Sequence, residues 1–278
     1  MLKKAYLEIT NVCNLSCSFC HGTRRKPAFL TVEQFRALTA KLKGHITYLY
    51  FHLMGEPLLH PELEQFLAIA QEYGFRVILT TNGTLIGKQM QTLLKAPALH
   101  KVSISLHSYE VNAMGRSLEE YLGDCCEFCK QASQKGIISV MRLWNRGGAD
   151  EMNRKILSYL HTEFPEEWTS SYASERLADR VFLEWGDRFD WPDLSAQEYD
   201  GAYKCYGLSD QIGVLCDGTV VPCCLDADGV IALGNLFEQE LDEILSSERA
   251  KKLKLSLQNR KPCEALCKHC GYAYQKKY

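Results

Sequence analysis

The stretch YLEITNVCNLSCSFC, residues 6–20, joins a short β-rich run to a loop that holds three cysteines. Cys13, Cys17 and Cys20 are close enough in the chain to reach one metal centre, and thiolates are the usual ligands of iron–sulfur clusters. If three thiolates bind a four-iron cubane, one iron keeps an open coordination position, which marks a catalytic rather than a structural metal. His21 could instead complete a closed Cys3His zinc site, so zinc stays open as the alternative.

Strand-like and helix-like runs alternate around and after this stretch. β-rich runs are expected at 6–10, 46–53, 75–81, 102–107, 137–144 and 180–185, and helical runs at 31–43, 62–73, 88–95, 118–135 and 151–163. This alternation favours an α/β fold of parallel strands with helices outside, which right-handed crossovers curl into a partial (β/α)6 barrel over residues 1–187. The cysteine loop, Gly55-Glu56-Pro57 and Asn82-Gly83 follow predicted strands, where such barrels place their chemistry.

A second cysteine-rich region follows where the alternation stops. Seven cysteines fall within 66 residues, Cys205–Cys270, around a hairpin predicted at Asp217-Gly218. Cys267 and Cys270 form a chelating CX2C pair. We therefore expect residues 188–278 to form a linker and a small domain that a metal centre stabilises, since so short a segment has little core of its own. Zinc is the alternative metal, because CX2C pairs suit both.

The N-terminal motif resembles the radical S-adenosylmethionine (SAM) superfamily signature CX3CXΦC, with Phe19 as the aromatic Φ that borders the adenine. The resemblance implies a [4Fe–4S] cluster on the three thiolates, with its open iron chelated by the amino and carboxylate groups of SAM. Gly55-Glu56-Pro57 resembles the GGEP motif that holds the SAM amino group, although Met54 replaces the first glycine. By the same resemblance Ser105 contacts the ribose and Arg142 the SAM carboxylate. Both could instead serve the substrate or packing.

The C-terminal cysteines resemble the SPASM/Twitch extension of that superfamily, which carries auxiliary [4Fe–4S] clusters. Their spacing is similar to the short, one-cluster Twitch form, and the longer SPASM form has a denser cysteine array near its end. The resemblance therefore implies one auxiliary cluster whose ligands are Cys205, Cys223, Cys267 and Cys270.

Six cysteines are left over by this assignment. Three are expected to be core thiols or hydrogen-atom donors to a substrate radical, as in some peptide epimerases of the family: Cys216, Cys224 and Cys263. The others lie in an apolar helical run and are expected to serve packing only: Cys125, Cys126 and Cys129.

Composition gives no case for a nucleic-acid or membrane partner. The 278 residues have a formal net charge of −2 and a pI near 6.5, so no general basic surface is expected. No apolar stretch reaches the ~20 residues of a membrane span. Glu8, Thr10 and Asn11 interrupt the apolar run that a signal peptide requires. A cytoplasmic location is expected, where thirteen cysteines favour metal ligation or catalysis over disulfides.

The implied cofactors are SAM and two [4Fe–4S] clusters, with a reductant such as flavodoxin or ferredoxin as partner. They predict an enzyme that cleaves SAM reductively to a 5′-deoxyadenosyl radical and abstracts hydrogen from its substrate. We expect a small polar, sugar- or cyclitol-like metabolite, oxidised with help from the auxiliary cluster, because no peptide-recognition segment precedes Cys13. The alternative is a ribosomal peptide that is crosslinked or epimerised. The remote alternative is a non-catalytic iron–sulfur electron carrier or zinc-binding protein.

Overall fold

The computed structural model describes residues 2–201 and 203–275, and a continuous mixed sheet runs through them. The sheet order is β11-β10-β9-β1-β2-β3-β4-β5-β8-β7-β6. The strands are β1 (Lys4–Leu7), β2 (Tyr48–Tyr50), β3 (Arg76–Thr81), β4 (Leu99–Ser105), β5 (Ile138–Arg146), β6 (Thr169–Ser171), β7 (Ser174–Ala178), β8 (Val181–Asp187), β9 (Gln211–Val214), β10 (Thr219–Val221) and β11 (Gly234–Asn235). Neighbouring strands pair in parallel through the run β1-β2-β3-β4-β5-β8, which confirms the predicted α/β partial barrel.

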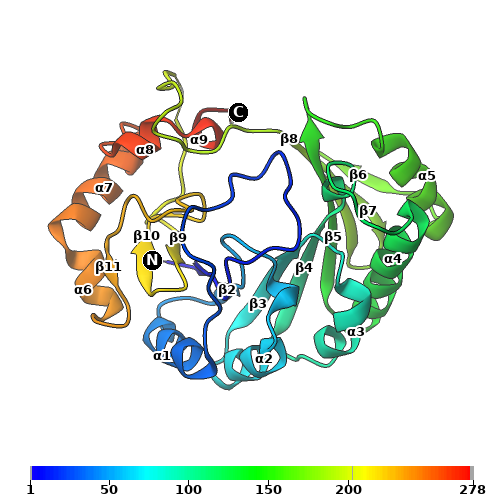
Figure 1. Ribbon diagram of the computed structural model, residues 1–278, viewed down its shortest axis with the longest axis horizontal. Helices are drawn as coiled ribbons and strands as arrows, with labels where there is room; N and C mark the ends of the chain where they lie inside the picture. The colour runs from blue at the N-terminus through cyan, green and yellow to red at the C-terminus, as the bar shows by residue number, and fades with distance from the viewer. Residues whose placement is uncertain (1, 202, 276–278) are drawn as a thin grey trace.

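Helices connect the parallel strands on the outer side of the curved sheet (Figure 1). They are α1 (Val32–Leu42), α2 (Leu63–Glu72), α3 (Ile86–Leu94), α4 (Leu118–Gln134) and α5 (Asn153–Glu163), followed in the C-terminal part by α6 (Leu241–Ser246), α7 (Glu248–Gln258), α8 (Ala265–Lys268) and α9 (Gly271–Gln275), with 3-10 turns η1 (Pro57–Leu59) and η2 (Leu106–Ser108). Thr31 and Ser117 cap α1 and α4, each in a capping box with the Gln or Glu three residues on. Each box satisfies two backbone N–H groups that have no partner inside the helix.

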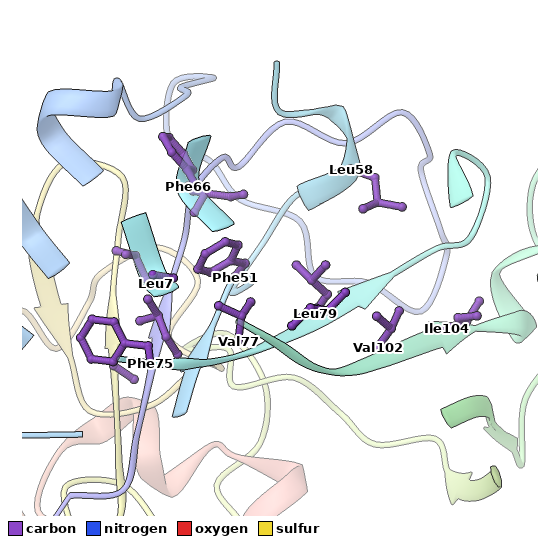
Figure 2. Close-up of a cluster of buried hydrophobic side chains, with 14 of the residues drawn as sticks. Leu7, Phe51, Leu58, Phe66, Phe75, Val77, Leu79, Val102 and Ile104 are labelled. Carbon is purple, nitrogen blue, oxygen red and sulfur yellow. The ribbon is translucent and has the colours of Figure 1, made fainter. Parts of the chain in front are cut away.

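The hydrophobic core lies between the outer face of the sheet and these helices. Val77 and Leu79 of β3 point into it together with Val102 of β4, and all three are fully buried (Figure 2). Phe35 of α1 stacks on Phe66 of α2 with 4.2 Å between ring centroids. The same core takes in the three cysteines of α4, in agreement with the packing role expected for them: Cys125, Cys126 and Cys129. The opposite, inner face of the sheet carries polar side chains such as Ser103 and Arg142 beside apolar ones such as Ile78 and Val140.

Two features of the sheet differ from the sequence prediction. The hairpin of β6 and β7 lies between α5 and β8, and the residues of β6 are exposed, so no apolar alternation marks them. At the other side, β9 pairs in parallel with β1, from Lys4 opposite Gln211 to Leu7 opposite Val214. The C-terminal segment therefore extends the barrel sheet. The hairpin predicted at residues 217–218 does join β9 to β10.

A buried ion pair fastens the loop after β1 to the sheet. Both guanidinium ends of Arg25 donate to the carboxylate of Glu8, at 2.8 and 2.6 Å, and Glu8 is fully buried. The backbone N–H groups of Met54 and Cys216 also donate to that carboxylate. Removing one partner of such a pair typically costs about 3–5 kcal/mol, because the other charge stays buried.

In the described part of the chain, no helix has the length and apolar character needed to cross a membrane.

Candidate active site

A cavity of about 530 Å³ opens at the carboxyl ends of the parallel strands. The three motif cysteines line it from the loop after β1: Cys13, Cys17 and Cys20. The residues predicted to contact SAM line it too: Phe19, Gly55, Glu56, Ser105 and Arg142. Segments between residues 13 and 142 thus meet at one cavity, as the strand-end positions of their motifs predicted.

Amide groups face two of the three thiols. The Nδ2 atom of Asn82 lies 3.9 Å from the Sγ of Cys13, and that of Asn112 lies 3.1 Å from the Sγ of Cys17. Burial raises the pKa of both thiols, that of Cys17 to about 11. A metal centre that binds thiolates offsets this cost, and the amide N–H groups stabilise the negative charge. The donor set therefore fits an iron–sulfur cluster with three thiolate ligands.

Among residues 2–201 and 203–275, no set of three or more Cys, His, Asp or Glu side chains is close enough to hold a single metal ion. The ligands of a cubane bind separate irons and do not have to converge on one point. His21, which would close a zinc site, lines a neighbouring hollow of about 360 Å³ and stacks with Trp191 at 6.1 Å between ring centroids.

The turn after β2 holds Glu56 at the cavity wall. Gly55 has a φ of +77°, and a Cβ there would lie 2.4 Å from the carbonyl oxygen of Thr10, so this position requires glycine. The Glu56 carboxylate accepts hydrogen bonds of 2.7 to 3.0 Å from the hydroxyl of Thr81 and the backbone N–H groups of Leu58 and Asn82. Burial nevertheless raises the pKa of Glu56 to about 7. An amino group donating to this carboxyl would favour its ionised form.

The raised pKa of Glu56 predicts a pH dependence of SAM binding. The free carboxyl is half ionised near pH 7, whereas an N–H donor binds the ionised form. The affinity for SAM should therefore rise between about pH 6 and 8, by up to roughly tenfold per pH unit below the pKa. Anaerobic equilibrium dialysis of SAM at several pH values measures this slope.

The matched control is E56Q, which keeps an acceptor oxygen but does not titrate. The amino group of SAM titrates by itself, so E56Q should show a shallower slope than the wild type. Equal slopes in the two proteins would contradict a role for Glu56 in holding the amino group.

Arg142 reaches the cavity from β5 with two partners of its own. Its Nε donates to Glu184 at 3.2 Å, and its guanidinium lies over the ring of Trp144 at 4.5 Å. Trp144 shares the inner face with Arg142 because it is two residues further along the strand. Ser105 lines the cavity at the end of β4, whereas Ser103 lies one pleat deeper and its buried hydroxyl has no hydrogen-bond partner in the described residues.

Three lining or supporting residues carry no clear signal in the sequence. His52 follows the last residue of β2 by two and lines the cavity, and burial lowers its pKa to about 3, so its ring is neutral. Side chains two residues apart on a strand point to the same face, so counting on from Tyr50 could have placed His52 at the cavity. Asn112 and Trp191 contact the cysteine loop across 95 and 172 residues of chain, and no local pattern predicts such pairs.

The four cysteines predicted to bind the auxiliary cluster come together beside β9 and β10. Burial raises the pKa of the Cys223 thiol. The negative charges that four neighbouring thiols would carry raise it further, and these are Cys205, Cys224, Cys270 and Cys267. Burial likewise raises the pKa of Cys267, and that of Cys270 to about 12, with Cys205 adding to both. Cys270 is buried and the other three are half-buried, and thiols that lie close together are what a cluster with four thiolate ligands requires. The set therefore fits an auxiliary cluster.

The remaining three cysteines of the C-terminal part lie in different surroundings. Cys224 lines the 530 Å³ cavity, and burial raises its pKa to about 11 despite a hydrogen bond with Tyr6. Cys216 is buried elsewhere, with its Sγ donating to the carbonyl oxygen of Glu8 at 3.1 Å. Cys263 is exposed. Cys224 is thus the candidate hydrogen donor that lines the cavity.

Two family models match the chain. The radical SAM superfamily matches residues 7–144, and an iron–sulfur cluster-binding domain, SPASM, matches residues 205–271. The first match covers the cysteine loop, strands β2 to β4 and most of β5, and the second covers all four cysteines of the auxiliary set. Together they imply one [4Fe–4S] cluster in each part and SAM, the cofactors predicted from the sequence.

Similar proteins include the antilisterial bacteriocin subtilosin biosynthesis protein AlbA of Bacillus subtilis. It is 26% identical over 273 residues, which is 90% of this chain and 60% of AlbA. The solved structure of BtrN in complex with AdoMet and 2-DOIA is similar over 97% of this chain and 93% of that one, with a TM-score of 0.63 and 18% identity. The structure of Streptococcus suis SuiB bound to S-adenosylmethionine is similar over 98% of this chain and 72% of SuiB, with a TM-score of 0.64 and 14% identity.

The matches span between 26% and 60% of the length of the curated relatives. The structural likeness is at low identity and supports the fold. The cysteine loop at the strand ends, the motif after β2 and the two family matches agree with one another. This chain therefore belongs to the radical SAM superfamily and carries a C-terminal iron–sulfur cluster-binding domain of the SPASM type.

Proposed function

We propose that this enzyme cleaves SAM reductively, removes a hydrogen atom from a carbon of a peptide substrate with the resulting 5′-deoxyadenosyl radical, and returns a hydrogen atom from the thiol of Cys224. The observation that carries this proposal is that Cys224 lines the same cavity as Cys13, Cys17 and Cys20. A cluster bound by those three cysteines supplies the electron for SAM cleavage. A flavodoxin or ferredoxin is the proposed source of that electron.

The protein positions SAM and keeps water away from the reaction. In the proposal Glu56 accepts N–H hydrogen bonds from the SAM amino group, and Arg142 binds its carboxylate while Glu184 and Trp144 hold the guanidinium in place. Phe19 borders the adenine and Ser105 the ribose. Phe189 and Trp191 add aromatic surface to the cavity wall. A dry cavity protects a carbon radical from side reactions.

Cys224 has the properties that a hydrogen-atom donor needs. A donor must keep its S–H bond at neutral pH, and a pKa of about 11 ensures this. The hydrogen bond with Tyr6 orients the side chain. The substrate radical would take the hydrogen from sulfur, which forms the C–H bond and leaves a thiyl radical on Cys224. One electron from the reductant and one proton then restore the thiol.

The chemistry of the cavity wall favours a peptide side chain over a polyhydroxylated ring. Part of the cavity wall is apolar: Leu53, Met54 and Trp191 belong to the same hydrophobic cluster as Cys224, and Leu225 and Phe189 line the cavity too. Such a wall gains free energy by burying an apolar side chain, whereas it leaves sugar hydroxyls without partners. AlbA is named for the biosynthesis of a bacteriocin, and SuiB has been solved bound to the precursor peptide SuiA.

The second candidate is the oxidation of a small polar, sugar- or cyclitol-like metabolite. Two observations favour it. The auxiliary set offers four thiols, and a cluster with a full set of protein ligands suits electron transfer. The structure of BtrN, solved with AdoMet and 2-DOIA, aligns with 97% of this chain over 93% of its own length. In this reaction the substrate radical would lose a proton to solvent, and a centre held by Cys205, Cys223, Cys267 and Cys270 would accept its electron. The substrate then leaves with two fewer hydrogen atoms.

The isotope content of the product separates the candidates. The enzyme, anaerobically reconstituted and supplied with SAM and dithionite in deuterated water, is incubated with candidate peptides and with polyols. Epimerisation should give an unchanged skeleton that carries one solvent deuterium per 5′-deoxyadenosine formed. Loss of two hydrogen atoms indicates oxidation or a peptide crosslink. Failure to form 5′-deoxyadenosine with dithionite would overturn both candidates.

A further inference from the structure

The loop that carries the three motif cysteines is held from two sides (Figure 1). Its first half contacts the barrel. The side chain of Asn14 bonds to Asn82 and Thr84, and the backbone N–H of Ser16 donates to Asn112 at 3.1 Å. These contacts come from the ends of β3 and β4 and fix the part of the loop that includes Cys13 and Cys17.

The second half of the loop contacts the C-terminal part of the chain. The indole N–H of Trp191 donates to the carbonyl oxygen of Phe19 at 2.9 Å. The carboxylate of Asp228 accepts 2.8 Å hydrogen bonds from the hydroxyl of Thr23 and the backbone N–H of Arg24. Cys20 lies between these two attachments. The position of the third motif cysteine is therefore set from the C-terminal part as well as from the barrel, where the ring of Phe19 packs on His107 at 4.7 Å between centroids and Arg25 pairs with Glu8.

Trp191 and Asp228 are both connected to the auxiliary cysteines, Trp191 through ring packing and Asp228 through the chain itself. Trp191 packs beside Phe189 at 5.4 Å, and Phe189 meets the ring of Tyr272, two residues beyond Cys270, at 5.0 Å between centroids. Asp228 lies in the turn that follows Cys223. The buried carboxylate of Asp226 shapes that turn by accepting the backbone N–H groups of residues 230 and 231 at 2.8 Å.

We propose that Trp191 and Asp228 are positioning residues for Phe19 and Cys20, so that the folding of the auxiliary set around its cluster determines the geometry of the SAM-binding site. The segment between residues 203 and 275 has small helices and short strands, and a metal centre stabilises such a segment. When the auxiliary set is empty, the turn with Asp228 and the linker with Trp191 lose their support. Phe19 and Cys20 then keep only their other contacts, which are with His107 of the barrel and with Cys17.

The test uses the full chain and needs no substrate. W191F keeps an aromatic ring against the linker but removes the N–H donor to Phe19. D228A removes the acceptor for the loop, and D228N restores an acceptor oxygen. The matched control is W168F, because the indole N–H of Trp168 donates to the carbonyl oxygen of Phe164 at the same distance of 2.9 Å, far from the loop.

Three readouts are compared after anaerobic reconstitution: the dissociation constant of SAM, the change that SAM causes in the electron paramagnetic resonance spectrum of the reduced protein, and the rate of iron loss to a chelator. W191F, which removes one hydrogen bond, should weaken SAM binding by about fivefold, and D228A, which removes two, should weaken it more. Both should alter the SAM-dependent spectral change. D228N should recover most of the affinity. W168F should match the wild type in all three.

The double variant C267A/C270A, which cannot hold the auxiliary cluster, should weaken SAM binding more than W191F does. Wild-type SAM affinity and spectra in W191F and D228A would overturn the proposal, as would wild-type affinity in C267A/C270A. An equal effect of W168F would show that the loss is not specific to the loop and would also overturn it. Because no substrate is used, these outcomes are independent of whether the product is a peptide or a small metabolite.

Discussion

Replacing Cys13, Cys17 and Cys20 together by alanine should abolish SAM cleavage and remove about half of the iron. Two [4Fe–4S] clusters correspond to about eight irons per chain, so the variant should keep about four. The reason is that its auxiliary set, near β9 and β10, is intact and separate from the cavity loop. Iron analysis after anaerobic reconstitution, with 5′-deoxyadenosine formed in the presence of dithionite, measures both effects.

Two further variants complete this experiment. C263A changes an exposed cysteine outside both sets and should keep the full iron content and full SAM cleavage. C267A/C270A should also retain about four irons, now on the N-terminal loop. A triple variant that keeps all of its iron, or that still forms 5′-deoxyadenosine, would contradict the assignment of Cys13, Cys17 and Cys20 as ligands.

Replacing Cys224 by alanine should leave SAM cleavage in place and nearly eliminate the incorporation of solvent deuterium into the peptide. This side chain makes none of the hydrogen bonds that hold the cavity loop to Asn112, Trp191 and Asp228, so 5′-deoxyadenosine should still form. The substrate radical, however, would have no thiol in the cavity wall to take a hydrogen atom from. Mass spectrometry of the peptide in deuterated water, with 5′-deoxyadenosine counted in parallel, measures the uncoupling.

C216A is the matched control, because Cys216 is also buried but points at the carbonyl oxygen of Glu8 rather than into the cavity. It should incorporate deuterium as the wild type does. If C224A still epimerises its substrate, Cys224 is not the donor. If C224A instead converts a polyol at the wild-type rate, the small-metabolite reaction is favoured.

Much of the barrel and part of the site could be predicted from the sequence because their signals are local. The motif at residues 13–20, the glycine and glutamate at 55–56 and the capping residue Thr31 each need only a few neighbouring residues to be read. Apolar alternation located β3 and β5 to within two residues at each end. Parallel strands then bring their carboxyl ends together, which places separate motifs at one cavity without further information.

The rest depends on contacts between distant parts of the chain. Asn112 and Trp191 reach the cysteine loop only after the chain folds, and nothing near them in the sequence indicates a partner. The hairpin of β6 and β7 is polar and exposed, so it lacks the pattern by which strands are found. Cys223 and Cys224 are adjacent, yet one is grouped with the auxiliary thiols and the other lines the cavity. Spacing alone does not separate two neighbouring cysteines.

The parallel pairing of β1 with β9 has a consequence for how the protein is made. Residues 4–7 leave the ribosome about 200 residues before residues 211–214, and one edge of that strand has no partner until the later residues follow. Contacts of such long sequence separation form late in folding. The loop directly after β1 is also attached to residues 227 and 228. Insertion of iron and sulfide at Cys13, Cys17 and Cys20 is therefore expected to follow synthesis of the chain up to residue 228.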